Sequence, residues 1–532
     1  MMVVRRVFPQ NADHHTRRSE MQLDFNDYLD KMRGCWNGKN IGGTLGAPFE
    51  GMRGVFDVRY YTQALDKPLP NDDLDLQLVW LNAAEKYGSQ VNSQILSEYW
   101  ISFIGPNWSE YGAGKNNLRM GLLPPLSGYV GNRFRESNGS WILTELWACL
   151  CPGHPELAVR YAYEDACVDH SGEGVNAAIF IAAIESAAFV ISDTDTLLDI
   201  GLSYLPDNSA IHKAVACARA CRENGLSWQQ ARKKLLQELP CSFSMVATLP
   251  SEMEPDEPVG EIGYDAPCHM GLLVMAWLYG EGSFDRSICI AASCGEDSDC
   301  TAGTLAAILG IVCGNRAIDE KWLRPLGGAI ETCSVIRGDH DISIPSTIDE
   351  LVQRVAIQMP RFLPVNCLTY SDVFLPCRIQ IDENQQFYTP ERVSCWYSRD
   401  TRKLFADPFL TVFQNSLIRA YVDNHGAPYI AEGAAKKFTI TFENLQRRQQ
   451  WLTLTLHTPE GWEVQPGKTL AVNLEQGHCN VPLARVTLEV TPHTLSQARN
   501  DLIIQVVSEG RPSQLFIPIV LLASGDYQIF SE

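Results

Sequence analysis

Residues 295–314 read GEDSDCTAGTLAAILGIVCG and place two aspartates, Asp297 and Asp299, one residue apart at the start of a run of small and apolar residues. A run of Ala, Gly, Ile and Leu with almost no polar face is typical of a helix that is packed on all sides. Acidic side chains at the mouth of such a helix need a partner. We therefore expect a matching polar group elsewhere in the chain.

A second acidic group lies at residues 70–88, PNDDLDLQLVWLNAAEKYG, where Asp72 and Asp73 precede apolar residues at helical spacing. One interpretation of both groups is helix capping, since acids accept hydrogen bonds from free backbone N–H groups and complement the helix dipole. Capping needs only one acid, however, and each helix start carries two. Four carboxylates brought together would repel each other unless they held a hard divalent ion such as Mg²⁺ or Mn²⁺.

A third stretch, GCWNGKNIGGTLGAPFEG at residues 34–51, carries glycines at roughly helical spacing and ends in Pro48, Phe49 and Glu50. Glycines at this spacing permit two helices to approach closely. Taken alone, the stretch indicates a tight helix contact followed by an exposed acid.

The chain divides into regions of different periodicity. Helical periodicity over residues 24–370 predicts one large all-α domain, interrupted by an acidic, aperiodic loop at residues 241–267 of the kind that often forms a lid. Residues 1–23 form an N-terminal tail and residues 371–410 a connector. Residues 411–532 contain evenly spaced segments with alternating apolar residues, which predict an antiparallel, Ig-like β-sandwich. TPEGWEVQPG, at residues 458–467, resembles sandwich modules appended to carbohydrate-active enzymes.

Composition excludes several classes of protein. The net charge of −20 over 532 residues argues against nucleic acid or an anionic membrane as the main partner. The N-terminus lacks a secretory apolar region, and no apolar run reaches the roughly 20 residues of a membrane span. The 17 cysteines are scattered without CxxC pairs, which favours reduced thiols and a cytoplasmic location.

The three stretches, together with PGHPELAVRYAYEDACVDHSGEGVNAAIF at residues 152–180, occur in an order that resembles the ADP-ribosylglycohydrolase family, which includes the dinitrogenase reductase-activating glycohydrolase. The family pattern is a Gly-rich helix ending in Gly-Ala-Pro-x-Glu, an Asp-Asp helix start, a His-containing segment, and Gly-x-Asp-Thr-Asp before a small-residue helix. The match spans roughly residues 28–360 and leaves the sandwich outside it.

The resemblance implies an all-α catalytic domain with two Mg²⁺ ions, or Mn²⁺, that hydrolyses the C1″ glycosidic bond of an ADP-ribosyl group. Glu50 and Asp297 are the catalytic residues that it implies, with Glu50 or a metal-bound aspartate as general base. The metal ligands that it implies are Asn71, Asp72, Asp73, Asp297, Asp299, Cys300 and Thr301.

The resemblance also implies contacts to the substrate. His170, with Asp169 and Glu173, would lie near the adenosine or ribose, although a His at a helix start is as often structural. Backbone N–H groups around Ser127 and Gly128 would meet the pyrophosphate, as turns and helix starts do. A plain turn is the alternative for those two residues.

Three positions depart from the family pattern. Gly43 stands where many members have Asp, Leu74 where Thr is common, and Cys300 where Thr or Ser often binds the second metal ion. A thiol is poorly matched to Mg²⁺. The second site is therefore expected to be weak, to favour Mn²⁺ or to recruit Thr301.

The expected partner is an ADP-ribosylated protein or an ADP-ribose-containing small molecule. A glycosidase acting on a smaller nucleoside or sugar conjugate is the nearest alternative, and the sandwich favours it. A non-catalytic module that binds ADP-ribose, or a scaffold of capped helices, is the alternative outside enzymes.

Overall fold

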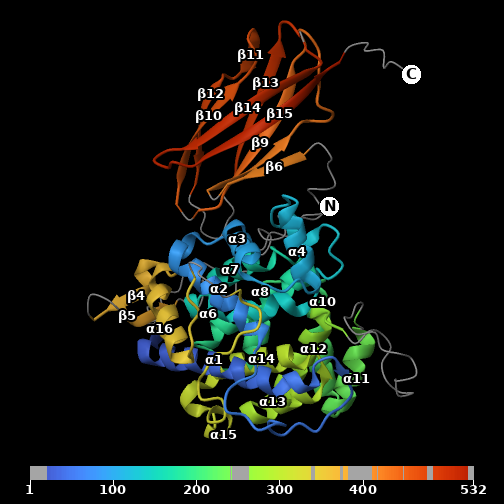
Figure 1. Ribbon diagram of the computed structural model, residues 1–532, viewed down its shortest axis with the longest axis vertical. Coiled ribbons are helices and arrows are strands. Elements are labelled where there is room, and N and C mark those ends of the chain that lie inside the picture. Colours follow the sequence, from blue (N-terminus) through green and yellow to red (C-terminus); the bar gives the residue numbers. More distant parts are fainter. Residues whose placement is uncertain are drawn as a thin grey trace, which may run out of the picture.

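The protein consists of a helical domain followed by a β-sandwich, as the sequence predicted, and each has its own hydrophobic core (Figure 1). The computed structural model describes residues 21–239, 241, 263–336, 342–371, 376–381, 387, 410–415, 417–446, 448–475, 483–495 and 497–524. Most of the predicted lid, residues 242–262, lies outside these described residues. Among the described residues, no helix combines the length and the apolar character that crossing a bilayer requires.

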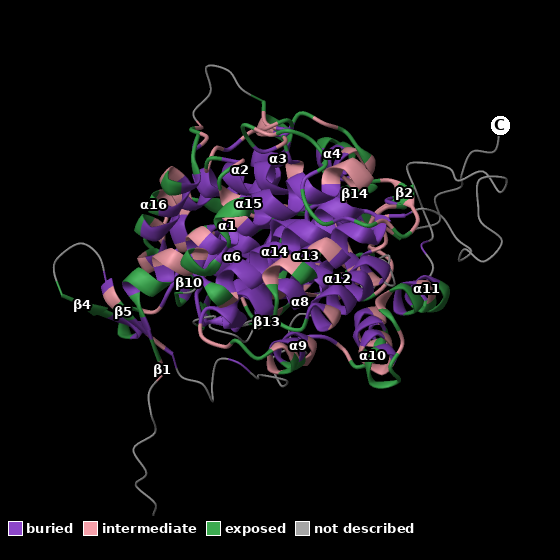
Figure 2. Ribbon diagram, turned by 90° about the horizontal axis from the view of Figure 1, so that it is seen from below, coloured by how far each residue is buried: buried purple, intermediate pink, exposed green. Residues whose placement is uncertain are grey.

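The helical domain runs from α1 to α16. Its helices are α1 (Phe25–Gly46), α2 (Asp72–Tyr87), α3 (Ser93–Phe103), α4 (Ser109–Arg119), α5 (Leu126–Tyr129), α6 (Glu145–Leu150), α7 (Pro155–Ala166), α8 (Glu173–Ala188), α9 (Thr194–Ser203), α10 (Ala210–Glu223), α11 (Trp228–Glu238), α12 (Ala266–Gly280), α13 (Phe284–Ser293), α14 (Ser298–Cys313), α15 (Glu320–Leu323) and α16 (Ile348–Gln358). Figure 2 shows α8 and α14 buried along most of their length, with α9, α10 and α11 at the periphery.

Helices α1 and α14 form the central pair, and small residues let their backbones touch. The facing positions, in antiparallel order, are Gly34 and Gly310, Gly38 and Ala306, Gly42 and Ala302, and Gly46 and Ser298. A Cβ atom at Gly38 would lie 2.1 Å from the carbonyl oxygen of Ala306, so only glycine fits there. This antiparallel packing brings the end of α1, which leads to Glu50, beside the start of α14, which carries the aspartates.

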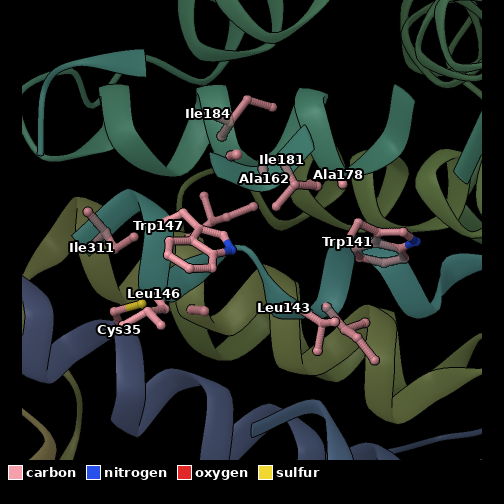
Figure 3. Close-up of a cluster of buried hydrophobic side chains, with 14 of the residues drawn as sticks. Cys35, Trp141, Leu143, Leu146, Trp147, Ala162, Ala178, Ile181, Ile184 and Ile311 are labelled. Carbon is pink, nitrogen blue, oxygen red and sulfur yellow. The ribbon is translucent and has the colours of Figure 1, made fainter. Parts of the chain in front are cut away.

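Large apolar side chains fill the space between this pair and α8 (Figure 3). Trp141 and Trp147 are completely buried, and the Trp147 ring stacks on Tyr161 with ring centroids 5.5 Å apart. Burying aromatic rings of this size contributes strongly to stability. The acids at the helix starts are therefore fixed to a rigid core.

A small sheet that the sequence pattern did not reveal closes the helical domain. Strand β1 (Met21–Asp24) pairs antiparallel with β5 (Pro376–Ile381), so that Leu23 lies opposite Ile379. On its other edge β5 pairs with β4 (Leu368–Tyr370). Part of the predicted connector thus belongs to the helical domain.

The sandwich packs two five-stranded sheets against each other. One has the order β12-β10-β14-β15-β8 and the other β11-β13-β9-β7-β6. The strands are β6 (Leu410–Gln414), β7 (Ile418–Asp423), β8 (Tyr429–Ile430), β9 (Lys436–Asn444), β10 (Gln450–His457), β11 (Trp462–Gln465), β12 (Thr469–Leu474), β13 (Leu483–Pro492), β14 (Arg499–Ser508) and β15 (Gln514–Ala523). The alternation predicted in β10 is confirmed, because Leu452, Leu454 and Leu456 are all buried.

Candidate active site

The acids at the start of α2 are held by a polar cap. Asn71 is the N-cap residue, and its Oδ1 accepts a hydrogen bond of 2.9 Å from the backbone N–H of Asp73. This leaves the carboxylates of Asp72 and Asp73 free of the capping role. The side chain of Asp73 is buried, and Asp72 accepts a hydrogen bond of 3.3 Å from the Tyr111 hydroxyl.

The start of α14 is built differently. Asp297 occupies the N-cap position, but its side chain makes no capping hydrogen bond. Its Oδ2 instead accepts a hydrogen bond of 2.5 Å from the side-chain amide of Asn138. Its backbone N–H donates to Nε2 of the buried His269 at 3.2 Å. The simple capping interpretation therefore does not account for Asp297.

The two helix starts meet and form two groups of metal-binding atoms. Ligand atoms of Asp73, Asp299 and Cys300 lie within 4.8 Å of one another, and so do those of Glu50, Asp297 and Asp299. Asp299 belongs to both groups. This arrangement provides two adjacent sites that share one carboxylate.

Within the part of the chain that the structure describes, three buried oxygens of the cluster lack a hydrogen-bond partner, namely Asp73 Oδ2, Asp297 Oδ1 and Asp299 Oδ1. Unpaired carboxylate oxygens inside a protein are costly, because water no longer solvates them. Divalent ions with a preference for oxygen ligands would satisfy all three atoms. The carboxylate oxygens therefore fit a pair of divalent ions, as expected from the sequence, whereas the Cys300 sulfur in one group is a poor ligand for Mg²⁺.

Proton affinities in the cluster are shifted in the direction expected for crowded acids. Repulsion from Asp299, then burial and repulsion from Asp72, raise the pKa of Glu50 to about 8. Burial and repulsion from Asp299 and Asp75 raise the pKa of Asp72 to about 7. Burial also raises the pKa of Asp73 and Asp297 well above the usual range. Such shifts are common at functional sites.

Glu50 lies at the solvent-exposed edge of the cluster, on a segment fixed to the α14 turn. The short helix η1 (Ala47–Phe49) leads from α1 to Glu50, and strand β2 (Met52–Arg53) pairs with β3 (Gly295–Glu296). The Gly51 N–H donates to the Glu296 carbonyl oxygen at 2.7 Å. An ion pair of 2.7 Å joins Arg53 and the buried Glu296 carboxylate. These contacts position Glu50 relative to Asp297.

Lys39 is a charged residue of the site that the sequence reading missed. Its ammonium group is fully buried in α1, 2.8 Å from Glu145 Oε1 and 3.6 Å from Asp73 Oδ2. It also donates to Thr304 Oγ1 at 3.0 Å. Its one sequence signal is that Lys39 is the only charged residue in the glycine-rich stretch at residues 34–46.

Three of the predicted metal ligands, Asn71, Cys300 and Thr301, make hydrogen bonds within the protein. Asn71 caps α2, and its Nδ2 fills the space that a side chain at Gly43 would take, since a Cβ there would lie 2.0 Å away. The Thr301 hydroxyl donates to the Asp297 carbonyl oxygen at 3.0 Å. The Cys300 thiol instead faces Asp73. The ligand roles of Asn71 and Thr301 stay predictions.

Two of the predicted substrate residues, Asp169 and His170, belong to a buried hydrogen-bond network that leads through Ser137 to the neighbour of Asp297, Asn138. His170 is fully buried, with Nδ1 2.8 Å from Asp169 Oδ1 and Nε2 2.8 Å from Ser137 Oγ. Burial lowers the pKa of His170, but Asp169 and two further acids outweigh it and raise that pKa. Ser137 directly precedes Asn138, so this network positions the amide that contacts Asp297.

The remaining substrate candidates lie around the same network. The Ser127 hydroxyl is buried and donates to the Val168 carbonyl oxygen at 2.6 Å, and Gly128 packs against the His170 backbone. Glu173 begins α8 and accepts a hydrogen bond of 3.4 Å from the Ile211 N–H. Their roles in substrate binding stay predictions.

Asn138 and Tyr264 were missed because nothing in their local sequence marks them. Tyr264 follows the undescribed part of the long loop, and burial together with the charges of Asp297, Glu50, Cys300 and Asp299 raises its hydroxyl pKa. Its backbone carbonyl accepts a hydrogen bond of 2.7 Å from the Asn138 N–H. The end of that loop therefore borders the acid cluster.

Comparison with known proteins identifies the family of the helical domain. The family model described as ADP-ribosylglycohydrolase matches residues 24–360. A solved structure titled "ADP-ribosylglycohydrolase-related protein complex" is 18% identical, with a TM-score of 0.39, and the alignment covers 64% of this chain and 99% of that one. No curated protein was found to match the chain.

The sandwich region has its own, weaker likenesses. A FixG-related protein from Vibrio parahaemolyticus is 9% identical, with a TM-score of 0.15, over 18% of this chain and 82% of that one. The PapD-like domain 7 of human CEP192 is 12% identical, with a TM-score of 0.15, over 20% of this chain and 84% of that one.

The fold and the paired acids thus define a protein whose helical domain holds a carboxylate cluster between two helix starts and is followed by a β-sandwich. Because the family model covers most of the chain, the protein belongs to the ADP-ribosylglycohydrolase family.

Proposed function

We propose that this protein is a metal-dependent hydrolase that cleaves the C1″ glycosidic bond of an ADP-ribosyl group carried by a protein side chain or a small molecule. The observation that carries the proposal is the convergence of Glu50, Asp73, Asp297 and Asp299 on two adjacent groups of ligand atoms. Family membership supports glycosidic hydrolysis as the reaction class.

Asp73, Asp297, Asp299 and Cys300 would hold the two ions, with Asp72 beside them. When bound, such ions supply positive charge that orients ribose hydroxyls and makes a bound water more acidic. The protein's own contribution begins with the rigid placement of these ligands on α2 and α14. Asn138 holds the Asp297 carboxylate in one orientation through its 2.5 Å hydrogen bond.

Glu50 is the proposed general base. A carboxylate oxygen of Glu50 lies within 4.8 Å of carboxylate oxygens of Asp297 and Asp299. Glu50 is exposed, whereas those two acids are buried. A water molecule can therefore reach Glu50 at the mouth of the cluster and lose a proton to it during attack on the anomeric carbon. Glycosidic cleavage has an oxocarbenium-like transition state, and the surrounding carboxylates would stabilise its positive charge.

The test is release of ADP-ribose from peptides ADP-ribosylated on arginine or on serine, with Mg²⁺ or Mn²⁺ present. Wild type should release ADP-ribose only with metal, and the linkage that is cleaved identifies the leaving group. Asp297→Asn should lower kcat by roughly 10²-fold or more, since a ligand and a charge are lost. Glu50→Gln should lower kcat because it removes the base, and it should weaken metal binding less than Asp297→Asn does, because Glu50 lies at the exposed edge of its group.

Arg59→Gln is the matched control, since Arg59 is exposed and pairs only with the nearby Asp57 within the described structure. It should leave the rate unchanged. If wild type binds metal tightly but releases no ADP-ribose from either peptide, the substrate is not an ADP-ribosylated arginine or serine side chain. Absence of both binding and release would leave the acids as structural groups and would reject the proposal.

A further inference from the structure

Cys300 places a sulfur atom inside the acid cluster. It lies in the first turn of α14, its side chain is buried, and its thiol donates to Asp73 Oδ1 at 3.4 Å. The sulfur lies within 4.8 Å of ligand oxygens of both Asp73 and Asp299. An aspartate from each helix and one thiol therefore share a small volume.

The polar groups beside Cys300 are already engaged. Thr301 Oγ1 donates to the carbonyl oxygens of Asp297 and Ser298, at 3.0 and 3.3 Å, and so lies along its own helix. Asn71 Oδ1 accepts the hydrogen bond that caps α2. The Cys300 sulfur, in contrast, is directed at Asp73 and is the third ligand atom of the group that contains Asp73 and Asp299.

The two carboxylates still have capacity to bind an ion. Asp73 Oδ2 and Asp299 Oδ1 are buried, and neither has a hydrogen-bond partner among the described residues. The Lys39 ammonium group, 3.6 Å from Asp73 Oδ2, offsets part of the negative charge there. Mg²⁺ binds through charge and oxygen ligands and keeps several waters, so a partly neutralised pocket with a thiol suits it poorly. A bond from sulfur to a transition metal is less dependent on charge.

We propose that Asp73, Asp299 and Cys300 bind a divalent transition-metal ion of the series from manganese to zinc, with Cys300 as a thiolate ligand that selects this ion over Mg²⁺. On binding, the S–H bond breaks, the sulfur–metal bond forms, and the proton leaves to solvent without any change of oxidation state. The inference rests on the two-ion site of the proposed function and adds the identity of one ion.

Co²⁺ is the probe, because thiolate ligation gives a sulfur-to-cobalt charge-transfer band in the near ultraviolet that oxygen ligands do not give. Titration of the full-length protein with Co²⁺ should produce this band. Cys300→Ser should lose it and bind Co²⁺ at least about tenfold more weakly, because a ligand is lost. The same variant should bind Mg²⁺ as well as wild type or better, as measured by calorimetry.

Two control variants separate Cys300 from the other thiols. Cys294→Ser removes a buried thiol six residues away that donates to the Ile290 carbonyl oxygen, and it should keep the band. Cys268→Ser disrupts a third group of ligand atoms, formed by Cys241, Cys268 and His269, and it should also keep a band that depends on Cys300.

The outcomes distinguish this inference from the proposed function. Co²⁺ binding without a charge-transfer band, an unchanged band in Cys300→Ser, or equally tight binding of Mg²⁺ and Co²⁺ by wild type would overturn the role of Cys300. Metal-dependent release of ADP-ribose would stand in each of those cases. If Co²⁺, Mn²⁺ and Mg²⁺ all fail to bind, both proposals fall.

Discussion

Single basic residues neutralise the buried acids in and around the acid cluster. Lys39 is buried with Glu145 and Asp73 on one side of the site, while Arg53 and Arg232 approach the buried Glu296 on another. Each cation compensates acids that water cannot reach. Buried ion pairs of this kind contribute little net stability, but removing one partner is strongly destabilising.

Lys39→Met is expected to lower the free energy of unfolding by about 3–5 kcal/mol, because it leaves the Glu145 carboxylate buried and unpaired. Urea denaturation followed by far-ultraviolet circular dichroism measures this loss. The double variant Lys39→Met/Glu145→Gln should recover part of it, since the carboxylate nearest to Lys39 is then neutral and only the more distant Asp73 has lost its cation. A double variant as unstable as the single one would show that Lys39 acts through packing alone.

His154 makes stability depend on pH. Burial lowers its pKa to about 4, and its ring nitrogens lie 2.8 Å from the Pro152 carbonyl oxygen and 3.4 Å from Cys367 Sγ. Between pH 6.5 and 4 the unfolded chain binds a proton at this residue that the folded chain does not. The free energy of unfolding is therefore unaffected by protonation of His154 above about pH 6.5 and decreases as the pH falls toward 4.

The size of this effect follows from the shift. From pH 7 to 4, wild type should lose up to about 3 kcal/mol more unfolding free energy than His154→Asn, whose side chain does not titrate. Urea denaturation at several pH values measures the difference. Equal slopes for the two proteins would rule out His154 as the titrating group.

At the scale of secondary-structure elements, the contact between α1 and α14 creates the site. Small residues four positions apart on both helices keep the backbones in contact, and the antiparallel direction joins Glu50 to Asp297 and Asp299. The function of the acids therefore depends on residues that carry no functional group.

Gly38→Ala should be strongly destabilising, since its Cβ would lie 2.1 Å from the Ala306 carbonyl oxygen and the helices would have to separate. We expect a loss of about 3 kcal/mol, larger than the gain of up to about 1 kcal/mol from helix propensity. Gly303→Ala in α14 is the matched control, because the nearest atoms to its Cβ lie 3.4–3.6 Å away. Thermal unfolding should show a lower Tm only for Gly38→Ala.

The sequence predicted those parts of the structure that depend on local pattern. The helix starts at Asp72 and Ser298 follow from acids placed before an apolar run, and the strands of the sandwich follow from alternation. Lys39 and Asn138 could not be predicted as site residues, because their partners, Glu145 and Asp297, are more than 100 positions away in the chain. The strand pairing of β1 with β5 escaped prediction for the same reason.

At the scale of the whole molecule, the helical domain and the sandwich have separate clusters of buried apolar residues. A side-chain hydrogen bond of 3.3 Å between Gln94 and Gln414 connects the two units. The ligand atoms of the acid cluster all come from the helical domain. Separate hydrophobic cores favour separate unfolding transitions.

Calorimetry of the full-length protein should therefore resolve two transitions. Mn²⁺ at 100 times its dissociation constant should stabilise the helical domain by about 2.7 kcal/mol and raise that transition by a few degrees. The sandwich transition should not move. A shift of both transitions together would show that the two units unfold as one.

Strand β5 follows the last helix of the domain, and β1 immediately precedes the first, so the chain enters and leaves the helical unit at neighbouring strands of one sheet. The two ends of the helical unit, residues 21 and 381, therefore lie side by side, and the unit is a cassette in the sense that it can be moved as one piece. Such a cassette can be placed within a loop of another protein, or permuted by joining residues 21 and 381 through a short linker and opening it at an exposed turn, without breaking the pairing of α1 with α14. New termini placed at Gly225, a turn glycine with open space around it, should leave the acid cluster intact.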